Sequence, residues 1–205
     1  MLILDNLENW VSLNMPIEER IVYFEFGGRH NTEATLKLAR ERAEKRGIKN
    51  VVLASITGFS AEKALEIFKD TDIKLTIVGI KGAGFPEFPK DLQERLRRLG
   101  HNFCYASDVQ YEFPGQVQDA LRRFCEGLKV CVEVALVAAD AGYVKPGEEI
   151  IAIGGTGMLG YEKGGGLDTA IVIEAVKSKD FLQLESIFGM KEKRRRIREI
   201  ICKPR

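Results

Sequence analysis

Apolar residues follow two alternating spacings along most of this chain. Continuous or every-second apolar positions, typical of β-strands, occupy residues 21–26, 50–56, 73–78, 102–106, 148–153 and 169–174. Between these segments the apolar positions recur every three or four residues, as on one face of a helix, over 31–46, 61–69, 89–99 and 116–141. The alternation predicts an α/β fold, a three-layer α/β/α sandwich with a mostly parallel sheet.

Small residues at the ends of these segments predict where some helices begin and end. Gly47 follows the first helical pattern and is a typical helix stop, while Ser60 precedes the second and is a typical N-cap. In the longest helical segment, Gly127 predicts an interruption. Residues 130–139 beyond it are apolar on nearly every face, which predicts a central buried helix.

The length of 205 residues fits a single domain. We divide it into an N-terminal arm (1–19), a core (20–175) whose last strand is 169–174, and a C-terminal extension (176–205). Apolar side chains in the arm make a homo-oligomer contact one role open to it; they are Leu4, Leu7, Trp10 and Val11. The basic segment 191–198 is expected to be the solvated face of a helix, with an anion contact as the alternative.

Charge and composition narrow the classes of partner. The formal net charge is only +1, with acidic and basic residues interspersed, which argues against nucleic acid as a partner. The N-terminus lacks the pattern of a signal peptide, and the apolar segment 130–139 is interrupted by Glu133 and too short to span a bilayer. We therefore expect a cytoplasmic protein with no membrane partner. The four cysteines have no metal-ligand spacing, so we expect reduced thiols and no metal site.

Two turns rich in small residues, each after a predicted strand, are the main candidates for a binding site. The first, at 55–60, reads Ser-Ile-Thr-Gly-Phe-Ser, and the second, at 154–157, reads Gly-Gly-Thr-Gly. Glycine lets backbone amides approach a ligand, hydroxyls add donors, and a helix N-terminus attracts negative charge. The combination predicts a phosphate site. The residues expected to contact the phosphate, or to close over it, are Asn31, Thr32, Ser55, Thr57, Gly58, Ser60, Gly154, Gly155, Thr156 and Gly157.

Two other interpretations of these turns are helix capping and a dinucleotide-binding fingerprint. Helix capping by Ser60 with Thr57 as strand filler would explain the first turn, but it would not explain the second. The segment Gly154–Gly160 is similar to a dinucleotide fingerprint, but no amphipathic helix or complete βαβαβ unit follows it, so a nicotinamide site is not expected.

Four ionisable residues are candidates for an acid–base or a structural role. His30, at the end of the first predicted strand, is either an acid–base residue or a surface histidine. His101 is expected to be structural. Glu133, in an apolar helix, should be paired or lie at the margin of the site, and Asp140 should share its face. None of them is assigned as a catalytic residue.

The middle of the chain, from about residue 31 to 175, resembles the C-terminal domain of pyruvate kinase. The resemblance is carried by NVVLASITGFSA at 50–61 and GYVKPGEEIIAIG at 142–154. It implies that Asp168 and Thr169 lie where that domain holds the phosphate of a regulatory sugar phosphate. The phosphoryl-transfer site of pyruvate kinase lies in a separate barrel that this chain lacks, so kinase activity is not implied.

The chain is also similar to stand-alone pyruvate kinase C-terminal domain-like proteins, which implies flavin mononucleotide (FMN) as the cofactor. The effector-loop arginines that would bind a sugar bisphosphate have no clear counterpart here. We expect a stand-alone domain that binds FMN or a similar phosphomonoester at the C-terminal edge of the sheet. The alternatives are a flavin-dependent or phosphate-ester enzyme using His30, Glu133 or Asp140, and a protein-interaction module using the glycine-rich segment Gly154–Gly166.

Overall fold

A seven-stranded sheet forms the middle layer of the computed structural model, which describes residues 16–82, 84–157, 165–183 and 196–205. In space the strands follow the order β1-β7-β6-β5-β2-β3-β4. Their bounds are β1 (Val22–Phe24), β2 (Asn50–Ala54), β3 (Lys74–Gly79), β4 (Asn102–Tyr105), β5 (Glu149–Gly154), β6 (Thr169–Glu174) and β7 (Ile197–Pro204). All neighbouring strands are parallel except β6, which is antiparallel to both β5 and β7, so the sheet is mostly parallel as predicted.

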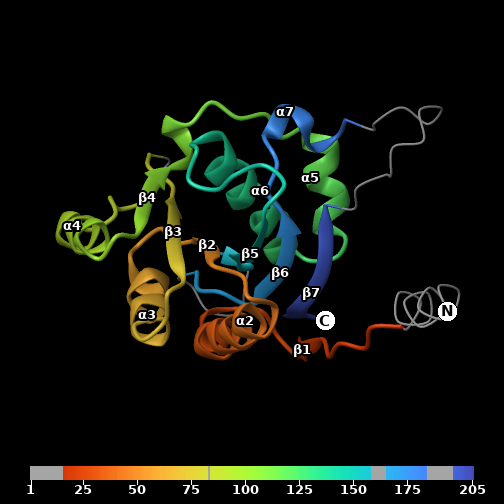
Figure 1. The fold of residues 1–205 in the computed structure, drawn as a ribbon. Helices are drawn as coiled ribbons and strands as arrows, with labels where there is room; N and C mark the ends of the chain where they lie inside the picture. Colours follow the sequence, from red (N-terminus) through yellow and green to blue (C-terminus); the bar gives the residue numbers. More distant parts are fainter. Residues whose placement is uncertain (1–15, 83, 158–164, 184–195) are drawn as a thin grey trace, which may run out of the picture.

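Helices cover both faces of this sheet, and the three-layer α/β/α sandwich is confirmed (Figure 1). The first face carries α2 (Thr32–Arg46), α3 (Phe59–Ile67) and α4 (Lys90–Arg98), and the second carries α5 (Gly115–Arg122), α6 (Glu126–Asp140) and α7 (Ser178–Phe181). Two short 3₁₀ helices, η1 (Arg29–Asn31) and η2 (Ala106–Asp108), follow β1 and β4.

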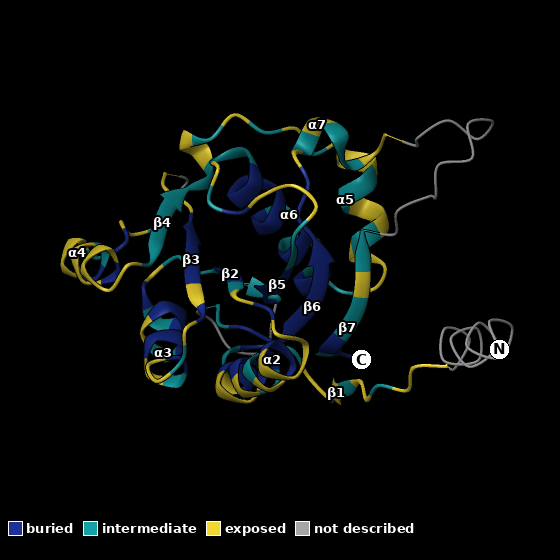
Figure 2. Cartoon of the chain, viewed as in Figure 1, coloured by how far each residue is buried: buried dark blue, intermediate teal, exposed yellow. Residues whose placement is uncertain are grey.

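The central strands are apolar at consecutive positions because both of their faces are buried. In β2, Val51 and Leu53 pack against the α2–α4 layer, while Val52 packs against α6, and all three side chains are fully buried. Figure 2 shows β6 and most of α6 as buried as the middle of the sheet. The prediction that residues 130–139 form a central buried helix is confirmed, since Val132 and Val137 are fully buried.

Two predicted helix boundaries are wrong by a few residues. Ser60 is not the N-cap of α3: Gly58, with φ +92°, makes the turn into a helix that begins at Phe59. The hydroxyl of Ser55 instead accepts a hydrogen bond from the amide of Ala61, at 3.3 Å. The break between α5 and α6 lies before Gly127, because the sulfur of Cys125 accepts from the amide of Leu128 and caps α6.

The C-terminal segment departs most from the prediction. Residues 197–204 form β7, which lies between β1 and β6, so β6 is not the last strand of the core and Arg198 is not on a helix. Burial does not alternate from residue to residue along β7. Ile201 and Cys202 are both buried, and Arg198 pairs with Glu174 at 2.7 Å. The rest of the basic segment, 191–195, and the apolar residues of the arm at 1–15 lie outside the described residues.

Among the described residues, every helix is too short or too polar to cross a membrane.

Gly127 gives a direct test of how tightly α6 packs on the sheet. A Cβ at this position would lie 2.0 Å from the hydroxyl oxygen and 2.6 Å from the Cβ of Thr169. We therefore expect Gly127→Ala to lower the free energy of unfolding by about 1–3 kcal/mol, measured by urea denaturation.

The matched control is Gly115→Ala, at the start of α5, where an added Cβ meets no atom of the described chain within 4 Å. Because alanine favours helix over glycine by up to about 1 kcal/mol, this variant should be as stable as the wild type or more so. Equal loss of stability in the two variants would contradict tight packing at Gly127.

Candidate functional site

The two predicted turns lie side by side at the carboxyl edge of the sheet. β2 and β5 are adjacent and parallel, with Leu53 paired to Ile153, so the turns that follow them begin at the same level. β6 runs the other way and starts at this edge, where Thr169 pairs with Gly154. The Thr57 and Thr156 turns are therefore neighbours, which the prediction of a shared site required.

This edge is also where the chain changes direction across the sheet. From β2 the chain passes to β3 through α3 on one face, and it reaches β5 through α6 on the other face. The loop after β2 leads toward β3 and the loop after β5 leads toward β6, so the two loops leave this edge in opposite directions along the sheet. In open α/β sheets, the crevice at such a point is the usual place for a ligand.

A third loop, the one after β1, joins the first two through Arg29. The guanidinium carbon of Arg29 lies 3.6 Å from the centre of the Phe59 ring, in the first turn of α3. Cation–π stacking thus holds a positive charge next to the N-terminus of α3. Arg29 was not among the predicted site residues, although its place directly after two glycines at a strand end could have marked it.

The buried carboxylate of Asp168 holds the loops of this edge together. Its Oδ2 accepts hydrogen bonds from the amide of Gly28 (2.9 Å) and from the amide and hydroxyl of Thr156 (3.0 and 2.6 Å). Its Oδ1 accepts from the hydroxyl of Thr169 at 2.8 Å. Asp168 and Thr169 are both fully buried, so in this structure they bind the loops to each other and present no surface to a ligand.

Asn31 and Thr32 have a similar internal role. The side-chain amide of Asn31 donates to the carbonyl of Phe26 at 2.7 Å. The hydroxyl of Thr32 donates to the carbonyl of Arg29 (2.7 Å) and accepts from the amide of Leu167 (3.0 Å). These bonds hold Leu167, which follows the glycine-rich segment, against the start of α2.

The glycines of the second turn allow the backbones to come close. A Cβ on Gly155 would lie 2.0 Å from the carbonyl oxygen of Gly166, and a Cβ on Gly154 would lie 2.6 Å from that of Gly127. Gly157, with φ +65°, is half-buried. The segment Gly160–Gly166 was also expected to close over the phosphate, and its residues 160–164 lie outside the described residues. Close packing thus explains Gly154 and Gly155 without a ligand.

In the first turn, by contrast, several hydrogen-bond donors have no acceptor among the described residues. The amides of residues 57–60 donate to no acceptor among the described residues, and the side chain of Thr57 is exposed. The hydroxyl of Ser60 likewise has no hydrogen-bond partner within the described ranges, although the residue is only 5 % exposed. Unpaired amides at a helix N-terminus beside a cation form an arrangement that can bind an anion. The outward part of the site is therefore Ser55–Ser60 with Arg29.

The other ionisable candidates lie apart from this turn or are already paired. The ring Nδ1 of His101 accepts from the amide of Leu75, and burial, aided by the charge of Lys74, lowers the pKa of the ring, as suits the structural role predicted. Glu133 pairs with Lys129 at 2.8 Å and accepts from the Tyr111 hydroxyl at 2.9 Å. Pairing was one of the two predictions for this residue.

Asp140 and His30 complete this group. Asp140 accepts from the amide of Ser178 near the start of α7. His30 lies exposed in η1, at the same edge as the two turns. Its position leaves both predicted roles, acid–base residue and surface histidine, open.

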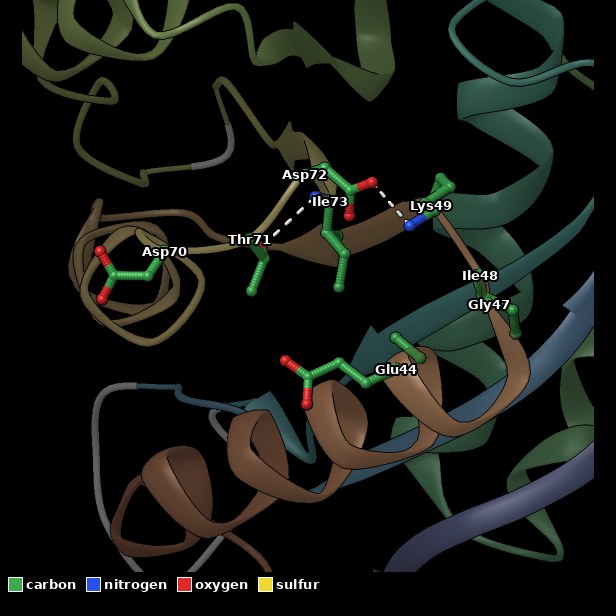
Figure 3. Close-up of a pocket in the computed structure, with 9 residues that line it drawn as sticks. Glu44, Gly47, Ile48, Lys49, Asp70, Thr71, Asp72 and Ile73 are labelled. Carbon is green, nitrogen blue, oxygen red and sulfur yellow. Dashed lines mark hydrogen bonds and ion pairs between the residues drawn. The ribbon is translucent and has the colours of Figure 1, made fainter.

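Two hollows lie away from the carboxyl edge. One of about 230 Å³ lies at the amino ends of β2 and β3, between Glu44 of α2 and the turn that holds Asp70 and Asp72 (Figure 3). Its lysine, Lys49, is already paired with Asp72 at 2.6 Å. A second hollow, of about 370 Å³, lies between α2 and residues 18–20.

Within the described ranges, no three His, Cys, Asp or Glu side chains gather closely enough to hold a metal ion. All four cysteines are free thiols, and burial raises the pKa of Cys202 to about 12.

Replacing Asp168 tests whether its carboxylate organises this edge. In Asp168→Asn an amide group would face donors that now bind the carboxylate, so at least one charged hydrogen bond, worth about 1.5–3 kcal/mol, is lost. We expect urea denaturation to show a loss of at least that size. Asp72→Asn is the control, because its side chain is 73 % exposed and a surface ion pair contributes about 0–1 kcal/mol. A loss no larger in Asp168→Asn than in Asp72→Asn would contradict this role.

One comparison with known protein families bears on the arrangement. A family model described as pyruvate kinase, alpha/beta domain, matches residues 33–173, from the first turn of α2 to the end of β6. The match includes both turns and Asp168 but leaves out Arg29, β1 and β7. Because it covers more than half of the 205 residues, this chain belongs to the family of the pyruvate kinase alpha/beta domain.

Proposed function

We propose that this chain is a stand-alone domain that binds a phosphomonoester at the carboxyl edge of its sheet, with FMN as the leading candidate. The observation that carries the proposal is the group of unpaired amides at residues 57–60, beside the charge of Arg29. These amides follow β2 at the carboxyl edge of the sheet, beside the end of β5, where open α/β domains bind ligands.

The phosphate would be bound by donors that have no other role in the fold. The amides at the start of α3 and the hydroxyls of Thr57 and Ser60 would donate to its oxygens, and Arg29 would balance its charge. Each charge-assisted bond contributes about 1.5–3 kcal/mol, so several together are of the order of the 8 kcal/mol that micromolar affinity requires.

The negative charge of Asp168 does not oppose this binding mode directly. Its carboxylate is fully buried and accepts four hydrogen bonds from Gly28, Thr156 and Thr169. We therefore assign Gly154–Gly157, Asp168 and Thr169 to the support of the site, and Ser55–Ser60 with Arg29 to the ligand. This narrows the set of twelve residues expected from the sequence.

Flat aromatic surface at the same edge favours a ligand with a ring system over a small sugar phosphate. Phe59 lies under Arg29, and Phe26, just before η1, is 51 % exposed. Ring faces of this kind stack on planar ligands. These rings support FMN over a sugar bisphosphate.

The hydroxyl of Thr57 gives the first test. We expect Thr57→Val to weaken FMN binding about tenfold or more, measured by quenching of flavin fluorescence, because one donor to the phosphate is replaced by a methyl group. Thr57→Ser, which keeps the hydroxyl, should bind within a few-fold of the wild type. If Thr57→Val binds FMN as tightly as the wild type, the phosphate lies elsewhere.

Arg29 gives the second test, with an exposed arginine of α4 as its matched control. Arg29→Met should weaken FMN binding at least tenfold, while Arg95→Met should leave it unchanged. Riboflavin, which lacks the phosphate, should bind much more weakly than FMN to the wild type and should not respond to Arg29→Met. Equal affinity for riboflavin and FMN would contradict a phosphate-centred site.

A further inference from the structure

The last residue of the glycine-rich segment, Gly166, lies directly against the backbone of Arg29. A Cβ on Gly166 would lie 2.4 Å from the Cα of Arg29 and 2.8 Å from the hydroxyl oxygen of Thr32. Because carbon atoms that are not bonded to each other pack at about 3.5–4.0 Å, no side chain fits between these two backbones. Gly166 also has φ +94°, a conformation that favours glycine. Position 166 thus requires glycine for space as well as for backbone conformation.

Gly166 has no room to move away from Arg29. Its carbonyl oxygen would lie 2.0 Å from a Cβ on Gly155, so it is in close contact with the turn after β5. The next residue, Leu167, is fully buried and donates its amide to the Thr32 hydroxyl at 3.0 Å. Arg29, by contrast, is half-buried and borders solvent. A side chain at position 166 would therefore displace Arg29 and not Gly166.

The loop at 27–29, which we call the β1 loop, is also held at its other end. The amide of Gly28 donates to Oδ2 of Asp168 at 2.9 Å. A Cβ on Gly27 would lie 2.4 Å from the Thr156 hydroxyl oxygen and 3.0 Å from the same carboxylate oxygen. The β1 loop is therefore fixed at its start by Asp168 and Thr156, and at its end by Gly166.

This double hold determines where the charge of Arg29 lies. The carbonyl of Arg29 accepts from the Thr32 hydroxyl at 2.7 Å, and its guanidinium carbon lies 3.6 Å from the centre of the Phe59 ring. A cation on a fixed backbone loses little conformational freedom when a ligand binds. A displacement of about 1 Å is enough to spoil the geometry of a binding site. Contacts of the Arg29 backbone should therefore control the charge beside the N-terminus of α3.

The charge and the residue that holds it come from different parts of the chain. Arg29 precedes the residues 33–173 that match the family model, whereas Gly166 lies within them. The contact between them joins the N-terminal addition to the family domain.

We propose that Gly166 is a positioning residue of the phosphate site and that, through Arg29, it determines the preference for FMN over riboflavin. The inference rests on the proposed function of this site. Gly166→Ala would require the Cα of Arg29 to move by about 1 Å or more to reach an ordinary contact distance. The amides of residues 57–60 would stay in place, so the change removes the counter-charge and none of these donors.

The first experiment measures the dissociation constants of FMN and of riboflavin by quenching of flavin fluorescence. Gly166→Ala should lower the preference for FMN at least tenfold, while its affinity for riboflavin stays within about threefold of the wild type. Gly147→Ala is the matched control: Gly147 has φ +89°, but an added Cβ there meets no atom of the described chain within 4 Å. It carries the same backbone strain without the contact and should keep the preference of the wild type. An equal loss of preference in both variants would overturn the proposal.

A double-mutant cycle tests whether Gly166 acts through Arg29. Gly166→Ala should weaken FMN binding in the wild type but add no further loss in Arg29→Met, because the charge is already absent. Additive losses would overturn the positioning role. If Arg29→Met weakens FMN binding and Gly166→Ala does not, the positioning role alone fails. If Arg29→Met has no effect either, the proposed function of the site fails with it.

Urea denaturation of each variant shows whether it is folded under the binding conditions. Should Gly166→Ala not fold, Gly27→Ala displaces the same loop from the side of Asp168, and the φ of Gly27 lies outside the left-handed region. Its Cβ would approach the Thr156 hydroxyl, which Asp168 holds in place at 2.6 Å. We expect Gly27→Ala to lower the preference for FMN at least tenfold as well. A folded Gly27→Ala with the full preference of the wild type would overturn the proposal.

Discussion

The buried carboxylate of Asp168 is the interaction on which the carboxyl edge of the sheet depends. It joins the loop after β1, through Gly28, to the turn after β5, through Thr156, across 140 and 12 residues of sequence respectively. A charge without exposure is costly unless every lone pair finds a donor, and here four hydrogen bonds supply them. The carboxylate fixes the arrangement of the loops, because the amides of Gly28 and Thr156 must both point toward it.

This internal anion explains why the two small-residue turns, similar in sequence, differ in role. The amide of Thr156 is bound to Asp168, and Gly154 and Gly155 make room for neighbouring backbone. The amides of residues 57–60 have no such carboxylate and remain available at the start of α3. The second turn therefore stabilises the fold. The first turn, with Arg29 stacked on Phe59, keeps donors that a ligand could use.

The strands added to the family domain shape the rest of the molecule. β7 lies between β6 and β1, and both β7 and β1 fall outside the matched residues 33–173. By covering β6, β7 moves the free edge of the sheet to β1. The loop from β1 also brings Arg29 and Gly28 to the site, so the same addition contributes to the carboxyl edge.

The amino-acid sequence alone determined the α/β class, the six strands from β1 to β6, the buried character of α6 and the location of the two turns at one edge. These follow from local periodicity and from the rule that parallel strands end at a common edge, which need no knowledge of partners. The sequence did not reveal β7, because residues 197–204 mix charged and apolar positions without a clear period. Nor could it show that Asp168 is buried or that Gly58 rather than Ser60 begins α3. These features depend on which distant groups meet: only the folded chain brings Gly28 and Thr156 to one carboxylate, because hydrogen bonds between residues far apart in sequence leave no local pattern.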